Sequence, residues 1–478
     1  MIWSGRCAFV PATRSHKALD LSKSRYVAGT QCHRLLWWKV HEPLAVELQP
    51  DKVLQDLFDQ GAQVEALALA QLSALGPRLS AQTSFEADET VVRVDALLAD
   101  GDGFRLIEVK STTSQKEEHL ADVAVQLHVL TKRGVNVRAV EIMHLNKEYR
   151  HPGHGELFER TDVTGEAQAL LPAIPAELEA QLAMLSGPLP DVPVGIHCHE
   201  PRDCPFMERC WPKERDHISK LYNVGPKKCA EYMTSGVHSI SQIPPAKKLP
   251  DAAKRQIRAL KEDRLVVEPG LAAALEPFDV KLGFLDFETI QRAVPVWPGM
   301  APWEQAAAQF SYHEARPDGT YSHAEFLAEG AEDCRPALAR AMIEATAGAE
   351  RVVSYSSFEK TRIRGLQVCV PELKTGLFEL EGKLIDLLPV LRDNVYHPDF
   401  HGSFSLKYVL TPLVPELTYK DLVIVDGMVA SVEIARLLFV AQRIPPEERA
   451  RVRQDLLDYC ERDTWAMVKL LERMRALA

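Results

Sequence analysis

The chain has 478 residues, of which 46% are hydrophobic and 26% charged, and its formal net charge at pH 7 is −11. This balance is typical of a folded protein with two to four domains, and it excludes collagen-like, disordered and low-complexity chains. The acidic total also excludes a uniformly basic nucleic-acid coat protein, but not a local basic patch.

The N-terminus lacks the apolar core of a signal peptide, and no apolar run reaches the ~18 residues that a membrane helix needs. We therefore expect a cytoplasmic protein with no membrane partner. Its nine cysteines are then expected to be thiols or metal ligands rather than disulfides.

The first half of the chain predicts a compact α/β unit that follows an aperiodic N-terminal tail. Helical periodicity and β-branched alternation predict the following elements in order: helices over 21–38 and 53–75, a strand, turn and strand over 91–111, a helix over 120–132 and a strand over 137–145. A proline-rich stretch over 187–195 then interrupts the pattern.

The middle and the second half of the chain differ in charge and in pattern. Residues 213–264 contain twelve Lys or Arg and six Asp or Glu, a balance of +6, and predict helices interrupted by turns. A second α/β unit begins at Val280. It is expected to contain strands over 280–289, 306–315 and up to 327, a helix over 334–346, a strand over 351–356, a helix from 358 and a mostly helical end from 429.

The first α/β unit carries a group of polar residues on its predicted hairpin. Glu108 and Lys110 share one face of a strand, and Asp95 on the preceding strand can reach that face. Two carboxylates beside a lysine suit metal-assisted phosphodiester hydrolysis: the acids hold Mg²⁺ or Mn²⁺, and the lysine orients water or stabilises charge. The next helix adds Asp122 and Gln126 on one face. The alternative interpretation is a solvated hairpin on which these acids and the lysine form a surface salt bridge.

In this context the residues resemble the PD-(D/E)xK nuclease superfamily, in particular its RecB-type branch. The resemblance implies that Asp95, Glu108 and Lys110 are catalytic and that Gln126 belongs to the family's glutamine motif. Many members carry a metal-binding histidine on the upstream helix. This chain has Val64 and Glu65 there instead, so that the histidine is missing.

Four cysteines flank the first unit. Cys198, Cys204 and Cys210 are evenly spaced, and Cys32 lies far upstream. Thiolates suit an iron–sulfur cluster or Zn²⁺, and unliganded buried thiols are the remaining alternative. One cysteine before a RecB-type nuclease and three after it resembles the iron–sulfur members of that family, which implies a structural 4Fe–4S cluster.

A second set of acids lies in the C-terminal unit. Asp286 and Glu288 share one face of a strand, Glu359 follows a later strand, and Tyr459 and Asp463 share one face of a helix. Four acids from separate elements can hold two divalent ions about 3.5–4 Å apart, with the tyrosine orienting the attacking water.

These motifs resemble a DEDD-type 3′→5′ exonuclease of the DnaQ-like group on an RNase H-like fold. The resemblance implies that Asp286, Glu288, Glu359 and Asp463 are metal ligands and that Tyr459 is catalytic. The second motif departs from the family pattern, because Tyr355 replaces an asparagine and Glu359 an aspartate. Elsewhere the segment 218–244 resembles a helix-hairpin-helix unit that binds phosphate, although a basic solvated spacer would have the same composition.

The combination resembles the bacterial family known as domain of unknown function 2779. We expect a multidomain α/β protein with four parts: an N-terminal tail (1–19), a RecB-like PD-(D/E)xK nuclease with the cysteine cluster (20–212), a basic helical linker (213–278) and an RNase H-like exonuclease (279–478). The expected function is metal-dependent nuclease action on nucleic-acid ends, with DNA favoured over RNA as the partner, in DNA repair, processing or defence. The alternative is an iron–sulfur nucleic-acid-binding scaffold whose nuclease sites have decayed in part or in full.

Overall fold

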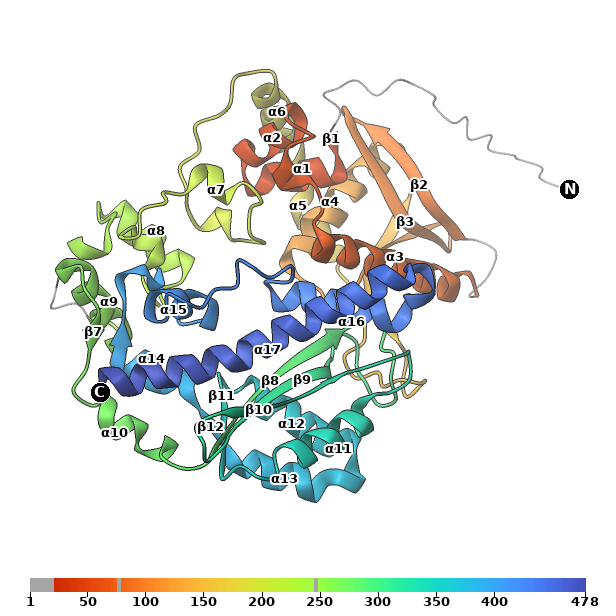
Figure 1. The fold of residues 1–478 in the computed structure, drawn as a ribbon. Helices are drawn as coiled ribbons and strands as arrows, with labels where there is room; N and C mark the ends of the chain where they lie inside the picture. Colours follow the sequence, from red (N-terminus) through yellow and green to blue (C-terminus); the bar gives the residue numbers. More distant parts are fainter. Residues whose placement is uncertain (1–20, 75–78, 245–247) are drawn as a thin grey trace, which may run out of the picture.

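A computed structural model describes residues 21–74, 79–244 and 248–478 (Figure 1). The predicted tail over 1–19, with Cys7, lies outside the described residues. The described chain forms two modules, each a mixed sheet with helices, and a helical linker between them. The predicted α/β class is therefore confirmed.

The first module is a six-stranded sheet with helices on both faces. Its strands are β1 (Leu21–Ser22), β2 (Leu79–Ala87), β3 (Thr90–Asp100), β4 (Gly103–Lys110), β5 (Val137–Leu145) and β6 (Phe158–Asp162), in the order β1-β3-β4-β5-β6, with β2 also paired to β3. Its helices are α1 (Lys23–Gln31), α2 (His33–His41), α3 (Lys52–Ser73), α4 (Glu117–Lys132), α5 (Thr164–Leu170) and α6 (Ile174–Leu185).

Two helices cover the sheet of the first module because alternate residues of its strands are apolar. Leu106 on β4 packs in the cluster that contains Val123 of α4, whereas the next residue, Ile107, packs with Val64 of α3. Helix α3 begins at the N-cap Asp51, and its buried residues recur every fourth position from Gln60 to Leu72. The strand end that carries Glu108 and Lys110 is therefore enclosed between helices.

The helix expected over 21–38 is divided in two. A short strand precedes it, and Cys32 has an extended backbone, with φ −163° and ψ 123°, that separates α1 from α2. This break directs the chain past the three downstream cysteines, one of which lies in the short helix α7 (Met207–Cys210).

The linker segment 218–244 contains one α-helix, whereas the predicted helix-hairpin-helix unit requires two. The elements of the whole linker are α8 (Pro226–Thr234), α9 (Asp251–Glu262), β7 (Val266–Val267) and α10 (Leu271–Leu275), so that the segment 218–244 holds one α-helix between two 3-10 turns. Strand β7 pairs with β13 (Val395–Tyr396) of the second module. A Cβ atom at Gly402 would lie 1.9 Å from the carbonyl oxygen of Lys220, so only glycine allows this close approach of module and linker.

The second module is a five-stranded sheet between two helical layers. Its strands are β8 (Leu282–Gln291), β9 (Gln305–Ala315), β10 (Tyr321–Leu327), β11 (Arg351–Ser354) and β12 (Leu384–Asp386), in the order β10-β9-β8-β11-β12. The pairs β10/β9 and β9/β8 are antiparallel, and β8/β11 and β11/β12 are parallel. Its helices are α11 (Arg335–Ala345), α12 (Phe358–Cys369), α13 (Lys374–Lys383), α14 (Leu387–Asn394), α15 (Leu406–Leu413), α16 (Gly427–Phe439) and α17 (Pro446–Leu477).

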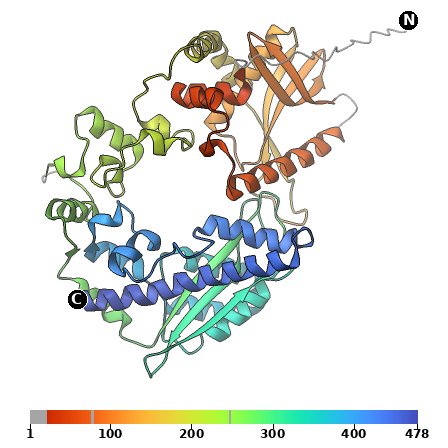
Figure 2. The ribbon, with the colours of Figure 1, turned by 45° about the horizontal axis from the view of Figure 1, so that its top comes forward.

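The long helix α17 crosses one face of this sheet, and α11, α12 and α13 lie on the other (Figure 1). The linker runs along one side of the molecule, while α3 of the first module meets α16 of the second on the other side (Figure 2). Arg292 Nη1 donates to both carboxylate oxygens of Asp56, at 2.7 and 3.0 Å, and the backbone N–H of Ala293 donates to Gln60 Oε1 at 2.6 Å. The two modules are thus in direct contact as well as joined by the linker.

Candidate active sites

The structure brings the predicted residues of the first site together between β3, β4 and α4. Asp95 Oδ2 accepts a hydrogen bond of 2.8 Å from the backbone N–H of Val109, which holds the two strands in register at this point. Lys110 Nζ lies 2.8 Å from Glu108 Oε1, and Gln126 Nε2 donates to Glu108 Oε2 at 2.8 Å. Lys110 and Gln126 therefore bond directly to the buried carboxylate of Glu108, and Asp95 is close enough for the Glu108 charge to act on it.

Two further residues complete this site. Lys23, at the start of α1, donates to Glu108 Oε1 at 2.6 Å, and Asp122 of α4 pairs with Lys110. Asp122 follows from its spacing to Gln126, but no sequence signal points to Lys23, because the pairing of β1 with β3 is what brings it to the site.

The two lysines determine the charge state of the first site. Burial raises the pKa of Glu108, but Lys110 and Lys23 outweigh it and lower that pKa to about 2. Burial and the Glu108 charge raise the pKa of Asp95 to about 7. Glu65 of α3 also raises the pKa of Asp95, so its carboxylate acts on the site, whereas Val64 is fully buried in the core.

The four predicted cysteines converge on one enclosed cavity. Cys32, Cys198, Cys204 and Cys210 all line it, together with apolar side chains that include Trp38 and Phe206. Backbone and side-chain bonds fix this loop: Gln31 Nε2 donates to the carbonyls of His197 at 2.9 Å and Arg202 at 2.7 Å, and Cys204 N donates to Cys198 O at 2.8 Å.

The four cysteine sulfurs that line this cavity are suitable donor atoms for a thiolate-bound metal group. Burial raises the pKa of Cys204 to about 11 and also raises that of Cys198. These two raised pKa values favour the protonated thiols of Cys198 and Cys204 in the absence of a cation. A metal centre would deprotonate its cysteine ligands and join the two distant segments that supply them. The other described cysteines, Cys229, Cys334, Cys369 and Cys460, are separate from this group.

The second predicted site lies where α17 crosses β8. Oxygen atoms of Asp286, Glu288 and Asp463 all lie within 4.8 Å of one another. Asp286 and Glu288 face α17 because Leu285 and Phe287 pack in the core on the opposite face of the sheet. A β-bulge follows Glu288, a feature that often re-aims side chains beside active sites.

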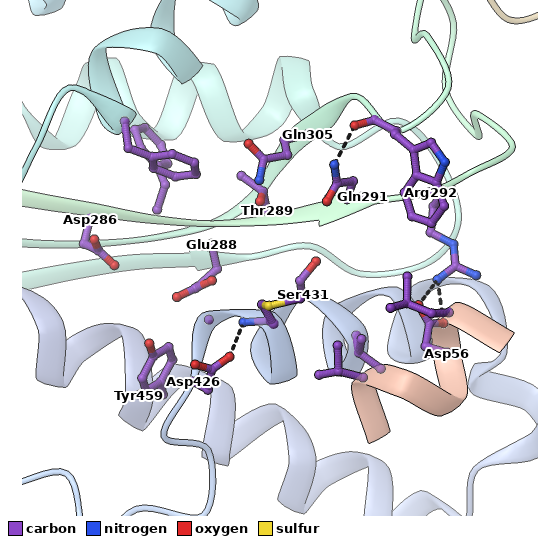
Figure 3. A pocket seen from close by; sticks show the side chains of 18 of the residues that line it. Asp56, Asp286, Glu288, Thr289, Gln291, Arg292, Gln305, Asp426, Ser431 and Tyr459 are labelled. Atoms are coloured by element: carbon purple, nitrogen blue, oxygen red, sulfur yellow. Dashed lines mark hydrogen bonds and ion pairs between the residues drawn. The ribbon is translucent and has the colours of Figure 1, made fainter. Parts of the chain in front are cut away.

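A cavity of about 420 Å³ opens beside these acids. Figure 3 shows Asp286 and Glu288 on the strand, with Tyr459 and Asp426 on the opposite side of the cavity. The wall at the other end comes from the first module: Val53, Asp56, Leu57 and Gln60 of α3 line the cavity. The sequence predicted two separate sites, and no sequence signal indicated that one module would line the site of the other.

The acids of the second site are buried with little positive charge. Burial and Asp463 raise the pKa of Asp286 and that of Glu288 well above the ordinary value. Burial raises the pKa of Asp463 to about 6, although Tyr419 and Tyr459 donate hydrogen bonds to it and Lys407 lies near. Such a cluster is stable only when protons or cations neutralise it, and carboxylate oxygens are the ligands that Mg²⁺ and Mn²⁺ prefer. The side chains present therefore fit divalent metal ions.

Glu359, the fourth predicted ligand, lies outside the group of acids whose oxygen atoms are within 4.8 Å of one another, although its charge acts on Asp286 and Glu288. It follows a strained turn. Its Oε2 atom is buried without a hydrogen-bond partner among the described residues, and burial raises its pKa to about 8. Ser356, three residues earlier, has a φ of 123°, and its backbone N–H donates to Asp386 Oδ1 at 3.0 Å. Asp386 thus anchors the turn that leads into α12, as a positioning residue.

The hydroxyl of Tyr355 donates to Phe404 O at 2.6 Å, so this side chain makes a structural hydrogen bond. Lys407 Nζ lies 5.3 Å from the ring centroid of Tyr459 and 3.7 Å from Asp426, so it brings positive charge close to the acids. Tyr419, whose hydroxyl donates to Asp463, had no sequence signal, because it lies in a loop before α16.

Some of the positively charged side chains of the linker are buried or paired with acids within the protein. The buried Arg255 pairs with Glu268 and donates to the carbonyls of Arg392 and Asp393 in the second module. Lys228 pairs with Glu231, whereas the neighbouring Lys227 is exposed on α8. Only part of the +6 balance therefore faces solvent.

A family model described as "Domain of unknown function (DUF2779)" matches residues 283–405. This segment contains β8 and α12, and hence Asp286, Glu288 and Glu359, and the match supports the family resemblance predicted from the sequence. No curated protein matches the chain.

Among solved structures, the chain is similar to one titled "Crystal structure of SSO0001", with 12% identity and a TM-score of 0.26 over 42% of this chain and 91% of that chain. A score this low does not establish a common fold. Within the described residues, no helix combines the length and the apolar character needed to cross a membrane.

Proposed function

We propose that the protein is a metal-dependent nuclease that acts on nucleic-acid ends. The observation that carries this proposal is the meeting of Asp286, Glu288 and Asp463 in an accessible cavity, with their oxygen atoms within 4.8 Å of one another. Divalent ions at such a cluster supply Lewis acidity and a nucleophilic water for phosphodiester hydrolysis.

The side chains around the acids suit the 3′→5′ trimming of a DEDD-type exonuclease. Tyr459 would orient the attacking water, Lys407 would balance charge on the scissile phosphate, and Glu359 would complete the ligand set from α12. The sheet, with three antiparallel strands followed by two parallel ones, supports the RNase H-like interpretation.

The first site would cut or resect a strand in the manner of a RecB-like PD-(D/E)xK nuclease. Asp95 and Glu108 would hold Mg²⁺ or Mn²⁺, Lys110 would position the water, and Gln126 would fix the rotamer of Glu108 through their hydrogen bond. The four cysteines would hold a 4Fe–4S cluster, with Zn²⁺ as the alternative, as a structural link between the two ends of this module.

A direct test is cleavage of end-labelled single- and double-stranded DNA and RNA by anaerobically purified protein with Mg²⁺, Mn²⁺ or a chelator. We expect metal-dependent loss of 3′ ends, with DNA preferred to RNA. Binding of these substrates without any cleavage, under every metal condition, would contradict the proposal and favour the scaffold alternative.

A second candidate is a protein with one active nuclease site. It is favoured by the first site, where both oxygens of Glu108 are already bonded to Lys23, Lys110 and Gln126. If that site has lost its metal, all cleavage will disappear in Asp286→Ala protein and none will be lost in Lys110→Ala protein.

The cysteine site has its own matched test. Cys204→Ser should remove the brown colour of the protein and destabilise the first module, whereas Cys369→Ser should do neither, because Cys369 lies in α12 of the second module. Colourless wild-type protein with a bound zinc equivalent that Cys204→Ser lacks would decide for Zn²⁺ at the cysteines.

A further inference from the structure

A second group of possible metal ligands lies on the outer part of the second sheet. His313 on β9 and His323 on β10 are directly opposite each other in the antiparallel register, and their rings stack with centroids 4.6 Å apart. Helix α17 brings Glu461 to the same point, with its Oε1 atom 3.9 Å from both His313 Nε2 and His323 Nδ1. The three ligand atoms lie within 4.8 Å of one another.

The hydrogen bonds behind these histidines determine which ring nitrogens carry protons. Thr464 Oγ1 lies 3.0 Å from the carbonyl oxygen of Glu461, and a carbonyl can only accept, so this contact takes the proton of the threonine hydroxyl. His313 Nδ1, 2.8 Å from Thr464 Oγ1, must then be the donor. Ser311 Oγ, 2.8 Å from Thr464 Oγ1, must also donate to it, so His323 Nε2 must donate to Ser311 at 2.9 Å.

This series of hydrogen bonds leaves the lone pair of each neutral imidazole ring on the nitrogen atom that faces Glu461. His313 Nε2 and His323 Nδ1 are the unprotonated atoms, and among the described residues neither has a partner within hydrogen-bonding distance. Burial and the neighbouring His323 lower the pKa of His313 to about 4, which keeps its ring neutral at physiological pH. Two lone pairs and a carboxylate therefore point at one position.

We propose that His313, His323 and Glu461 bind a single divalent transition-metal ion of the zinc class. Two imidazole nitrogens and one carboxylate oxygen form a donor set that suits Zn²⁺, and a fourth, open position completes its tetrahedral geometry. The second nitrogen of each histidine is held by a hydroxyl, which is the outer-shell arrangement that orients metal-binding histidines. Glu461 is 48% exposed and His323 24%, so water can reach the fourth position.

The ion would join α17 to strands β9 and β10, which already pair with each other through backbone hydrogen bonds. Strands β9 and β10 supply the histidines, and α17 supplies the carboxylate two residues before Asp463. The site shares no ligand with the acidic cluster on β8 and stands independently of the proposed nuclease function. Binding would fix the position of α17 over the sheet.

The test is zinc binding by untagged, chelator-treated protein in excess Mg²⁺, measured by calorimetry and by metal analysis after dialysis. Excess Mg²⁺ is present because the acidic cluster takes hard cations. His323→Ala and Glu461→Gln should each bind one equivalent of zinc less than the wild type. His154→Ala, which alters an exposed histidine of the first module, should bind the same number as the wild type.

A second variant tests the hydrogen-bond argument. Thr464→Val keeps the shape of a buried side chain and all three ligands but removes the central hydroxyl, so zinc affinity should fall about 10–100-fold. With Co²⁺, the wild type should show ligand-field bands that His323→Ala lacks and Cys204→Ser retains. Equal zinc stoichiometry in the wild type, His323→Ala and Glu461→Gln would overturn the proposal, as would an unchanged affinity in Thr464→Val.

Discussion

The two carboxylate sites differ in how their negative charge is neutralised. In the first site, Lys23 and Lys110 both contact Glu108, and the pKa of that acid falls to about 2. In the second, burial and mutual repulsion raise the pKa values of Asp286 and Glu288, and the charge of Lys407 opposes this rise at Glu288. Lysine side chains therefore compensate the negative charge of the first site, whereas the negative charge of the second site is compensated much less.

Nuclease activity of variants is the most direct test of this difference between the two sites. Asp286→Asn and Asp463→Asn should each reduce 3′ trimming by at least ~10²-fold, because metal ions at such a site supply several kcal/mol of transition-state stabilisation. The double variant should be little worse than either single one, since residues that act as a unit are not additive. Lys110→Ala serves as the control from the other module. Trimming undiminished in the double variant would contradict the assignment of this site.

Stability in the presence of chelator should change in opposite directions at the two sites. Glu108→Gln leaves two lysines beside a neutral amide and should destabilise the protein by on the order of 3 kcal/mol. Asp286→Asn removes one of several buried acids and should raise the melting temperature by roughly 2–4 °C, the shift expected for about 1 kcal/mol in a module of this size. Thermal unfolding monitored by circular dichroism measures both. A loss of stability in Asp286→Asn would show that its charge is already compensated without metal.

The pH dependence of the free energy of unfolding should also differ between the two sites. The pKa of Glu359 is about 8 and that of Asp463 about 6, both above the ~4 of unfolded carboxyls, so the folded state binds protons more tightly. In chelator, stability should therefore fall as pH rises from about 4 to 8, and Mg²⁺ should remove this loss. Glu108, with its lowered pKa, contributes stability above about pH 4 that is lost only as pH falls toward 2.

Melting curves at several pH values, with Glu359→Gln as the comparison, measure this effect. The variant should show a shallower decline between pH 6 and 8 in chelator, because one titrating group has been removed. A decline that Mg²⁺ does not reduce would argue against metal binding at these acids.

The smallest expected effect lies at the contact between the modules. Asp56→Asn weakens the ion pair with Arg292 at the end of the cavity, and such a partly buried pair contributes about 1 kcal/mol. The KM for the nucleic-acid substrate should rise a few-fold with kcat unchanged. Asp59→Asn, at an exposed position of the same helix, is the matched control and should leave both constants unchanged.

Local patterns predicted most elements of both modules. Strand β5 spans Val137–Leu145 as expected, and β8 and β9 differ from the predicted ranges by a few residues. Period-two alternation works here because each strand has an apolar face against helices, as Leu285 and Phe287 illustrate. The helix expected over 21–38 was wrong in its continuity, since tertiary contacts around Cys32 override its helical periodicity.

Residues of the sites were predictable when they lay on one element or on neighbouring ones. The hairpin places Asp95 beside Glu108, and helical spacing places Tyr459 beside Asp463. Lys23 and Tyr419 could not be found in this way, because long-range pairing brings them to their acids from elements without any recognisable pattern.

Helix α3 belongs to the first module but lines the cavity of the second site. The border between the two modules therefore does not coincide with the border of that site. The α3 residues Val53, Asp56 and Leu57 form one wall of a cavity whose acids lie more than 200 positions later in the chain. A fragment that starts at residue 279 would hold every predicted metal ligand of that site and still lack part of the cavity wall. Cutting the gene at the apparent domain border, or exchanging the first module for an unrelated one, would therefore change the shape of the cavity beside these acids.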